Sequence, residues 1–444
     1  MVSTNNSAVD AGRPPSNRSV VLPRGAAFWL VGLVSVLLLV SSTVPSPMYV
    51  IYQQQWGFSA AMITLIFGIY ALFVLGSMLL FGSLSDTVGR KPVLVFALVL
   101  MVVAMVLFIV ADSVAWLLVA RAIQGIGVGI ATGTLGAALI ELSPNPGRGM
   151  LVNTTAPTLG MALGALGSGL LVQFAPAPTV LSYAILLVVF VVLGVLTLTL
   201  PETAPSAGHG FKIVPRRISV PKAARRAFGL TSLSIVAVWA IGGLYLSLGP
   251  SLVAEMLHST SHVLGGLVVT GLAGGGTVAQ LLFRKLPGNR PIVLGGILLL
   301  IALALVTISL STVSVTVFFI GTVVLGLGWG SAFMGAFRSM AALADPAHRG
   351  ELLAAVYTVA YLAMSVPSII AGIVVPHAGL HNTTNWFIVV VAVLVVVALA
   401  SLPFVNRHHR SGAAGAHEPT DHHAPAPCCL PTTHAHPVAA GAAN

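Results

Sequence analysis

The chain has 444 residues, of which 57% are hydrophobic and only 7% are charged. A soluble globular protein has about 25% charged residues, so this chain has too few polar side chains to cover a soluble surface. The composition excludes a disordered protein, a nucleic-acid-binding domain and an ordinary cytosolic enzyme, although the net charge of +10 alone would suggest a nucleic-acid partner.

A polar tail with three arginines, residues 1–25, begins the chain. The first apolar stretch after it is as long as a full membrane span, so we expect a retained helix rather than a cleaved signal peptide.

Twelve apolar stretches follow, and each is long enough for a helix that crosses a bilayer, which needs about 20 residues. They lie near 26–48, 60–81, 92–111, 114–142, 151–174, 179–200, 228–250, 262–283, 291–311, 315–343, 351–375 and 384–405. They are longer than β-barrel strands and do not alternate in polarity. We therefore predict an all-α integral membrane protein with 12 transmembrane helices.

The basic residues predict the orientation of these helices. Every Lys and Arg except Arg121 and Arg338 lies in a tail or in a loop on one side of the predicted membrane. Loops rich in Lys and Arg stay in the cytoplasm, so we expect a multi-pass protein of the cytoplasmic (inner) membrane with both termini in the cytoplasm. The excess positive charge then faces anionic lipid rather than nucleic acid.

The middle of the chain predicts a division into two halves. Residues 201–227 form a basic loop with four prolines, which we interpret as a cytoplasmic linker between residues 26–200 and residues 228–405. The halves also repeat each other, because Gly125, Gly127 and Gly129 recur 201 residues later as Gly326, Gly328 and Gly330. Such repeats indicate two pseudo-symmetric six-helix bundles with a binding site between them.

The loop after the second stretch carries the most specific motif. Six of its residues match the signature Gly-x-Leu-x-Asp-Arg-x-Gly-Arg-Lys of the major facilitator superfamily, and Thr87 replaces the first arginine. The matching residues are Gly82, Leu84, Asp86, Gly89, Arg90 and Lys91. The chain therefore resembles this superfamily of transporters over about residues 26–405, and the two-bundle layout is similar to its fold.

The resemblance implies that this motif closes a cytoplasmic gate in the outward-open state. Asp86 would lie close to a helix N-terminus in the second half, where the helix dipole favours a carboxylate. Arg90 would bridge Asp86 to Glu141, the only acid at the cytoplasmic end of the fourth span. The alternative is a solvated turn that merely carries the positive charges of a cytoplasmic loop.

The fourth span contains Arg121, Gln124, Gly125 and Gly127 in a pattern similar to the superfamily's Arg-x-x-Gln-Gly-x-Gly. An arginine inside a span is costly unless it faces a cavity or a partner. The resemblance implies that Arg121, Gln124 and Gly125 take part in proton transfer or in the response to substrate. The alternative is that Arg121 snorkels to the outer membrane interface.

Small residues form stripes on the fourth and fifth spans, where they let helices approach closely. Gly125, Gly129 and Gly133 lie on one face of the fourth span, and Gly160 and Gly164 do so on the fifth. Close packing alone and a hinge are both consistent with them. The fifth span matches the drug:proton antiporter branch only partly, because Ala165 stands where that branch has proline.

The resemblance also implies a central cavity lined by spans 1, 4, 7 and 10 and flanked by spans 2, 5, 8 and 11. Candidate lining residues on these spans are Tyr70, Asn153, Trp239, Tyr245, Trp329, Tyr357 and Tyr361. No Asp or Glu lies near the middle of any span. A cation that loses its hydration needs a negatively charged partner. The sequence therefore favours neutral, lipophilic or anionic substrates.

The histidine-rich segment 406–444 ends the chain, and we expect it to be a cytoplasmic tail. His422, His423, Cys428 and Cys429 are weak candidates for metal binding, although a dispensable low-complexity tail is the simpler interpretation. Two adjacent cysteines cannot form a disulfide framework.

These observations predict a monomeric secondary transporter that is not an enzyme and has no cofactor. Proton-coupled export of a hydrophobic small molecule by alternating access is the first choice. Uptake of a sugar or an organic acid with a coupling ion is the second. A transporter-like metal sensor that acts through the tail is the alternative from another class.

Overall fold

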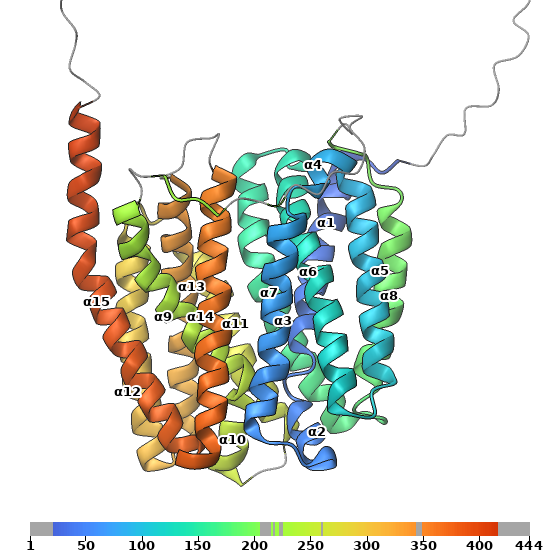
Figure 1. The fold of residues 1–444 in the computed structure, drawn as a ribbon, viewed down its shortest axis with the longest axis vertical. Coiled ribbons are helices and arrows are strands. Elements are labelled where there is room, and N and C mark those ends of the chain that lie inside the picture. Colours follow the sequence, from blue (N-terminus) through green and yellow to red (C-terminus); the bar gives the residue numbers. More distant parts are fainter. Residues whose placement is uncertain are drawn as a thin grey trace, which may run out of the picture. The chain divides into compact units, whose positions relative to one another are not determined.

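The computed structural model describes residues 21–204, 215, 218–221, 225–258, 261–342 and 349–415. Every regular element of these residues is a helix (Figure 1). Contacts divide the chain into the unit Met1–Leu402 and the unit Pro403–Asn444. The tail residues predicted to bind metal, His422, His423, Cys428 and Cys429, lie outside the described residues.

The helices of the first half are α1 (Arg24–Thr43), α2 (Tyr49–Trp56), α3 (Ala60–Phe81), α4 (Leu84–Val88), α5 (Arg90–Ile109), α6 (Val114–Leu142), α7 (Pro146–Phe174) and α8 (Leu181–Thr197). Those of the second half are α9 (Arg225–Ser247), α10 (Gly249–Leu257), α11 (His262–Leu282), α12 (Arg290–Thr312), α13 (Val315–Ala342), α14 (Arg349–Ala378) and α15 (Leu380–Gly415).

Eleven helices of the described residues are long and apolar enough to cross a membrane. The remaining predicted span, 179–200, contains α8, which has only 17 residues. Tight turns continue the chain to Leu200, whose N–H donates to Thr197 O at 3.1 Å. At 1.5 Å per residue the 17 residues of α8 span about 26 Å, which is the lower limit for a transmembrane helix.

The first membrane-spanning helix of each half ends before the predicted residue, because a short helix follows it. In the first half α1 ends at Thr43, and a turn that contains Pro45 and Pro47 separates it from α2. In the second half α9 ends at Ser247, and α10 begins with Gly249 and Pro250. Proline has no N–H to continue a helix, so prolines interrupt both halves at corresponding places.

Each half has a hydrophobic core of its own. Buried side chains of α1–α8 form one cluster, in which the Phe108 ring stacks on Tyr183 with centroids 4.6 Å apart. Buried side chains of α9–α15 form another, in which Tyr245 stacks on Phe318 with centroids 6.3 Å apart. These clusters are called the first-half core and the second-half core below.

The glycine stripes bring helix backbones together inside the first half. A Cβ at Gly125 or Gly129 would collide with α3, and a Cβ at Gly160 or Gly164 would collide with α1. A Cβ at Gly133 would have only an ordinary contact, 3.6 Å from Gly82 O. Four of the five predicted positions therefore pack closely, whereas a hinge function stays a prediction.

The two halves meet mainly where α7 packs on α11 and α3 packs on α14. A buried apolar cluster joins them, called the inter-half cluster: Phe67, Ala71, Ala165, Leu246, Val269 and Met364. Along α7 and α11, Thr277 Oγ1 donates to Thr158 Oγ1 at 2.8 Å, and His262 N donates to Gln173 Oε1 at 3.0 Å. Ala165, at the position of the missing proline, is fully buried in this cluster.

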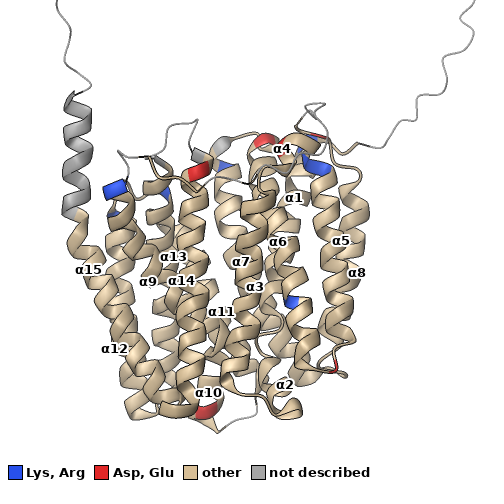
Figure 2. Ribbon diagram, in the orientation of Figure 1, with Lys and Arg blue, Asp and Glu red and all other residues tan. Residues whose placement is uncertain are grey.

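Charged residues gather at one end of the helices, where α4 lies (Figure 2). This end, called the basic end below, includes the loops around Arg90, Arg148 and Arg290. The end with α2 and α10 is called the opposite end. The described residues thus separate basic and non-basic loops as the orientation prediction requires, while the assignment of the basic end to the cytoplasm stays a prediction.

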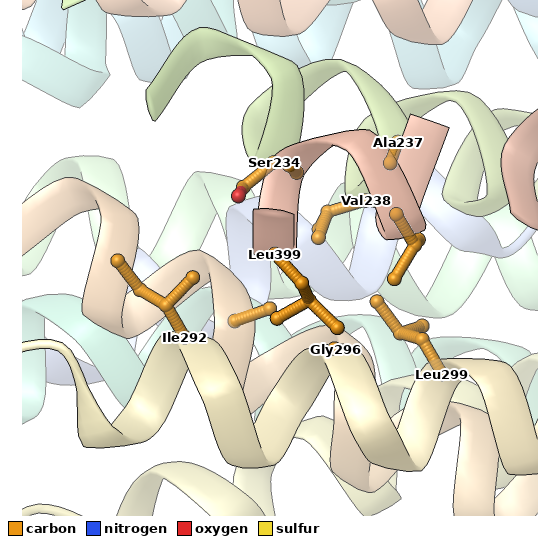
Figure 3. A pocket seen from close by; sticks show the side chains of 10 residues that line it. Ser234, Ala237, Val238, Ile292, Gly296, Leu299 and Leu399 are labelled. Atoms are coloured by element: carbon orange, nitrogen blue, oxygen red, sulfur yellow. The ribbon is translucent and has the colours of Figure 1, made fainter. Parts of the chain in front are cut away.

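A small cavity lies within the second half, between α9, α12, α13 and α15 (Figure 3). Its lining includes Ser234, Val238, Ile292, Gly296, Leu299 and Leu399. The cavity volume is about 10 Å³, which is roughly the space of one water molecule, and its walls are apolar apart from Ser234. It is a packing void rather than a substrate site.

Candidate functional site

At the basic end, the guanidinium of Arg90 contacts two carboxylates. Its Nη1 donates to Asp86 Oδ1 at 2.5 Å and its Nη2 to Glu141 Oε1 at 3.0 Å. The Arg90 side chain is 12% exposed, the Glu141 side chain 32% and the Asp86 side chain 51%. The predicted contacts of Arg90 are present, whereas their gating role and the predicted approach of Asp86 to a second-half helix stay predictions.

Glu202, which lies in the predicted linker, binds the start of α5. Its Oε1 accepts from Arg90 N at 2.7 Å and its Oε2 from Lys91 N at 3.1 Å. The first N–H groups of a helix lack partners within the helix and carry partial positive charge, so a carboxylate stabilises them. Gly89 precedes them with φ +106°, and a Cβ there would be 2.7 Å from Glu202 Oε2.

Glu141 joins further parts of the first half to this network. Its Oε2 accepts from Thr203 Oγ1 at 2.5 Å, and its carbonyl oxygen accepts from Arg24 Nη2 at 2.7 Å. The loop between α3 and α5, the end of α6, the start of α1 and linker residues 202–203 are therefore held together at one point. Neither Glu202 nor Thr203 was among the predicted site residues.

Glu202→Gln should weaken this attachment without changing the size of the side chain. Glutamine has no charge and one acceptor oxygen for the two N–H groups, so we expect a loss of about 1 kcal/mol, or a fall in Tm of about 2 °C. Thermal unfolding of the purified protein measures the change. Glu255→Gln, at an exposed acid on α10, is the control, and equal Tm values for the two variants would contradict the capping role.

In the first half, Arg121 of α6 lies in the protein interior, and its side chain is completely buried. Its Nε and Nη2 both donate to Tyr49 Oη, the Nε at 2.8 Å. Its Nη1 donates to Gln124 Oε1 at 2.8 Å and to Ser42 O at 2.9 Å. The alternative that Arg121 snorkels to the membrane interface is wrong.

Aromatic rings surround this guanidinium. Its central carbon is 5.1 Å from the Tyr70 ring centre, 5.5 Å from that of Tyr49 and 6.0 Å from that of Phe108. Ring faces attract a cation at such distances. Gly125 allows α6 to approach this part of α3, because a Cβ there would be 2.6 Å from Tyr70 O.

Gln124 is buried beside Arg121, so the predicted pair lies together. Its Nε2 donates to Ser41 O at 2.9 Å, which ties α6 to the end of α1. In the described residues, the groups that contact Arg121 are hydroxyl, amide and carbonyl oxygens and aromatic rings. A tyrosine hydroxyl, with an ordinary pKa of about 10, is neutral at pH 7. Arg121 is therefore a buried positive charge stabilised by neutral groups, which can attract an anion or respond to a change in nearby charge.

The other predicted cavity residues are spread over three places. Tyr357 and Tyr361 lie on α14 in an aromatic cluster with Trp239. Tyr245 and Trp329 belong to the second-half core, with exposed fractions of 2% and 5%. Asn153 faces α6, since a Cβ at Gly136 would be 3.3 Å from its Oδ1.

The described residues contain no group of three or more His, Cys, Asp or Glu side chains that could hold a metal ion.

Comparisons with known proteins agree with the geometry. The sequence model of the Major Facilitator Superfamily matches residues 31–366. Multidrug resistance protein MdtL of Shewanella sp. is 28% identical over 165 residues, which are 36% of this chain and 41% of MdtL. The uncharacterized MFS-type transporter EfpA of Mycobacterium tuberculosis is 34% identical over 135 residues, 30% of this chain and 25% of EfpA. The chain thus matches less than half the length of these relatives.

Two solved structures are similar in fold. The first is an inward-facing, unoccupied structure of a bacterial homologue of the human lysosomal transporter Spinster, with a TM-score of 0.69 at 16% identity. The match covers 87% of this chain and 98% of the homologue's chain. The second is the human organic anion transporter MFSD10 (TETRAN), with a TM-score of 0.60 at 18% identity. The match covers 85% of this chain and 100% of the MFSD10 chain. At these identities the likeness concerns the fold alone.

Proposed function

The chain belongs to the Major Facilitator Superfamily of membrane transporters, and we propose that it exports a hydrophobic small molecule in exchange for protons. It is a multi-pass membrane protein with the fold of that superfamily, and its substrate is a small molecule. We place it in the cytoplasmic membrane as a monomer, with the basic end in the cytoplasm.

The observation that carries this proposal is the chemistry of the interior. The acids of the described residues, Asp86, Asp112, Glu141, Glu202, Glu255 and Glu351, lie at or near helix ends. The contact between the halves is formed largely by apolar side chains with Trp239 and Tyr361 packed against them, which suit a molecule that leaves water readily. The printed name of MdtL, a multidrug resistance protein, agrees with export.

Alternating access supplies the mechanism. The hydrogen bonds between α7 and α11 use Thr158 and Ala162 near the middle of α7 and Gln173 at its opposite end. With the basic end in the cytoplasm, the inter-half cluster seals the outer side in this conformation. Rocking of the halves about the central site would open that seal and close the cytoplasmic side, where Arg90, Asp86 and Glu141 act as the gate.

Coupling to protons is assigned to the surroundings of Arg121. An arginine keeps its proton at physiological pH, so it acts through its charge and its hydrogen bonds rather than by carrying the proton itself. A substrate or proton that arrives between the halves changes the electrostatic energy of this buried charge. Tyr49 transmits the change to α2, and Gln124 transmits it to α1.

The proposal is tested with inside-out vesicles from cells with and without this protein. We expect an imposed pH gradient to drive accumulation of lipophilic dyes or antibiotics only in vesicles that contain the protein, and an uncoupler to abolish it. Absence of accumulation for every compound, with the protein present in the membrane, would contradict proton-driven export.

Uptake of an organic acid is the second candidate function, because the buried positive charge of Arg121 attracts anions. The fold-related MFSD10 is described as an organic anion transporter. Right-side-out vesicles distinguish the two functions, since they should accumulate labelled organic acids only if the second is correct.

A further inference from the structure

Five aromatic side chains from three helices of the second half form a closed ring of contacts. Centroid distances are 5.3 Å for Trp239–Phe333, 5.9 Å for Phe333–Phe337, 5.8 Å for Phe337–Tyr357, 6.4 Å for Tyr357–Tyr361 and 5.3 Å for Tyr361–Trp239. The residues on α13 and those on α14 are each four apart, so each pair lies on one helix face. This group is called the aromatic cluster.

The aromatic cluster differs from the aromatic residues of the cores. All five of its side chains are only partly buried, whereas Tyr183, Tyr245 and Phe318 are almost completely buried. Trp239 and Tyr361 pack against the inter-half cluster, whose members come from α3 and α7 as well as from the second half. The aromatic cluster therefore borders the contact between the halves, and its residues are less completely buried than the aromatic residues of the cores.

Tyr361 connects this surface to the Arg121 site. It packs against the first-half core, to which Tyr70 belongs. The Tyr70 ring in turn lies 5.1 Å from the Arg121 guanidinium. A molecule on the aromatic cluster would thus have a buried positive charge on the far side of Tyr70.

We infer that the aromatic cluster is the binding surface for the transported molecule, and that this molecule is a planar aromatic compound without a positive charge. The inference rests on the proposed function and adds the substrate class. Flat rings gain from offset or edge-to-face contact with five aromatic side chains.

The charge of the molecule follows from two opposed effects. Ring faces attract cations. A desolvated cation also loses its hydration, and none of the described acids lies near the middle of a membrane-spanning helix to replace it. Arg121 adds repulsion, and the loss of hydration is the larger effect, so neutral and anionic rings bind better than cationic ones.

Calorimetric titration of the purified full-length chain in detergent tests this inference, with titration into detergent alone subtracted. Three probes share one ring system: 1-naphthol is neutral, 1-naphthoate is anionic and 1-naphthylmethylammonium is cationic. We expect the first two to bind and the third to bind at least about tenfold more weakly. A saturated analogue, decahydronaphthalene-1-carboxylate, should also bind more weakly than 1-naphthoate, because it has no flat ring to stack.

Variants locate the site. Phe337→Leu and Tyr357→Leu should each weaken binding of 1-naphthol and 1-naphthoate about 2- to 10-fold, the range for loss of one aromatic contact. Phe174→Leu removes a ring that is 78% exposed at the end of α7, and binding should not change. Equal affinities in these three variants would overturn the site, and tightest binding of the cation would overturn the substrate class.

The outcome is separable from that of the proposed function. If vesicles transport other compounds but the naphthyl probes do not bind, the inference is wrong and the proposed function stands. If the probes bind in the expected order but are not exported against a pH gradient, the binding surface stands and proton-driven export is wrong.

Discussion

Arg121→Ala is expected to abolish transport and to lower the stability of the protein. The substitution leaves Tyr49 Oη, Gln124 Oε1 and Ser42 O without their donor, and these groups are buried. A buried acceptor without a partner costs about 1–3 kcal/mol, although hydrogen bonds inside membranes average only about 0.6 kcal/mol. We therefore expect a total loss of about 2–5 kcal/mol, measured as a fall in Tm, together with loss of vesicle transport.

Milder substitutions keep the test informative if Arg121→Ala does not fold. Arg121→Lys preserves the charge but cannot donate two hydrogen bonds to Tyr49, so transport should fall at least about tenfold. Tyr49→Phe removes only the hydroxyl and should have an intermediate effect. Arg338→Ala is the matched control, since this exposed arginine of α13 donates to Arg284 O at 3.0 Å near the basic end. Normal transport with normal proton dependence in Arg121→Ala would remove Arg121 from the coupling mechanism.

Arg90→Ala is expected to reduce transport about tenfold or more by releasing the network at the basic end. The substitution leaves the carboxylates of Asp86 and Glu141 without their shared cation. Because these side chains are partly exposed, their contacts lie between surface ion pairs, worth up to about 1 kcal/mol, and buried ones, whose disruption costs about 3–5 kcal/mol. A double-mutant cycle with Glu141→Gln should give a coupling energy of about 1–2 kcal/mol in unfolding experiments.

Transport measurements then separate gating from stability. Asp86→Asn keeps the size of the side chain and weakens only the ionic contact, so it should impair transport with little change in Tm. Arg290→Ala is the control, because Arg290 begins α12 as Arg90 begins α5, in a loop of similar sequence. If Asp86→Asn and Arg290→Ala transport equally well, the gate assignment is wrong.

The apolar stretches alone were sufficient to predict most of the fold. A helix of about 20 apolar residues has no soluble alternative at this composition, so predicted and observed spans mostly agree within about five residues. The exception is α15, which continues to Gly415, ten residues beyond the predicted end at 405. The interruptions at Pro45 and Pro250 were not predicted, because apolar residues continue through both prolines. Hydropathy measures transfer into lipid, whereas the end of a helix depends on backbone hydrogen bonds that proline cannot make.

Contacts within the candidate sites were predictable only where few partners existed. Glu141 is the single acid near the end of the fourth span, so its contact with Arg90 followed from elimination and family resemblance. Tyr49 could not be found in this way, since it is 72 residues from Arg121 and meets it only after α1 packs on α6. Phe333 and Phe337 did carry a signal, because aromatic residues four apart share a helix face.

The attachment of Glu202 and Thr203 changes where the chain can be divided. The two residues follow the last span of the first half, yet their hydrogen bonds end on α5 and α6. By its hydrogen bonds, the first half therefore extends through Ala204, whose N–H donates to Glu202 Oε1 at 3.2 Å. For co-expression of the two halves as separate polypeptides, a cut after Leu200 removes the anion from a helix start more than 100 residues earlier. A cut beyond Ala204 leaves that helix start intact and tests the covalent connection alone.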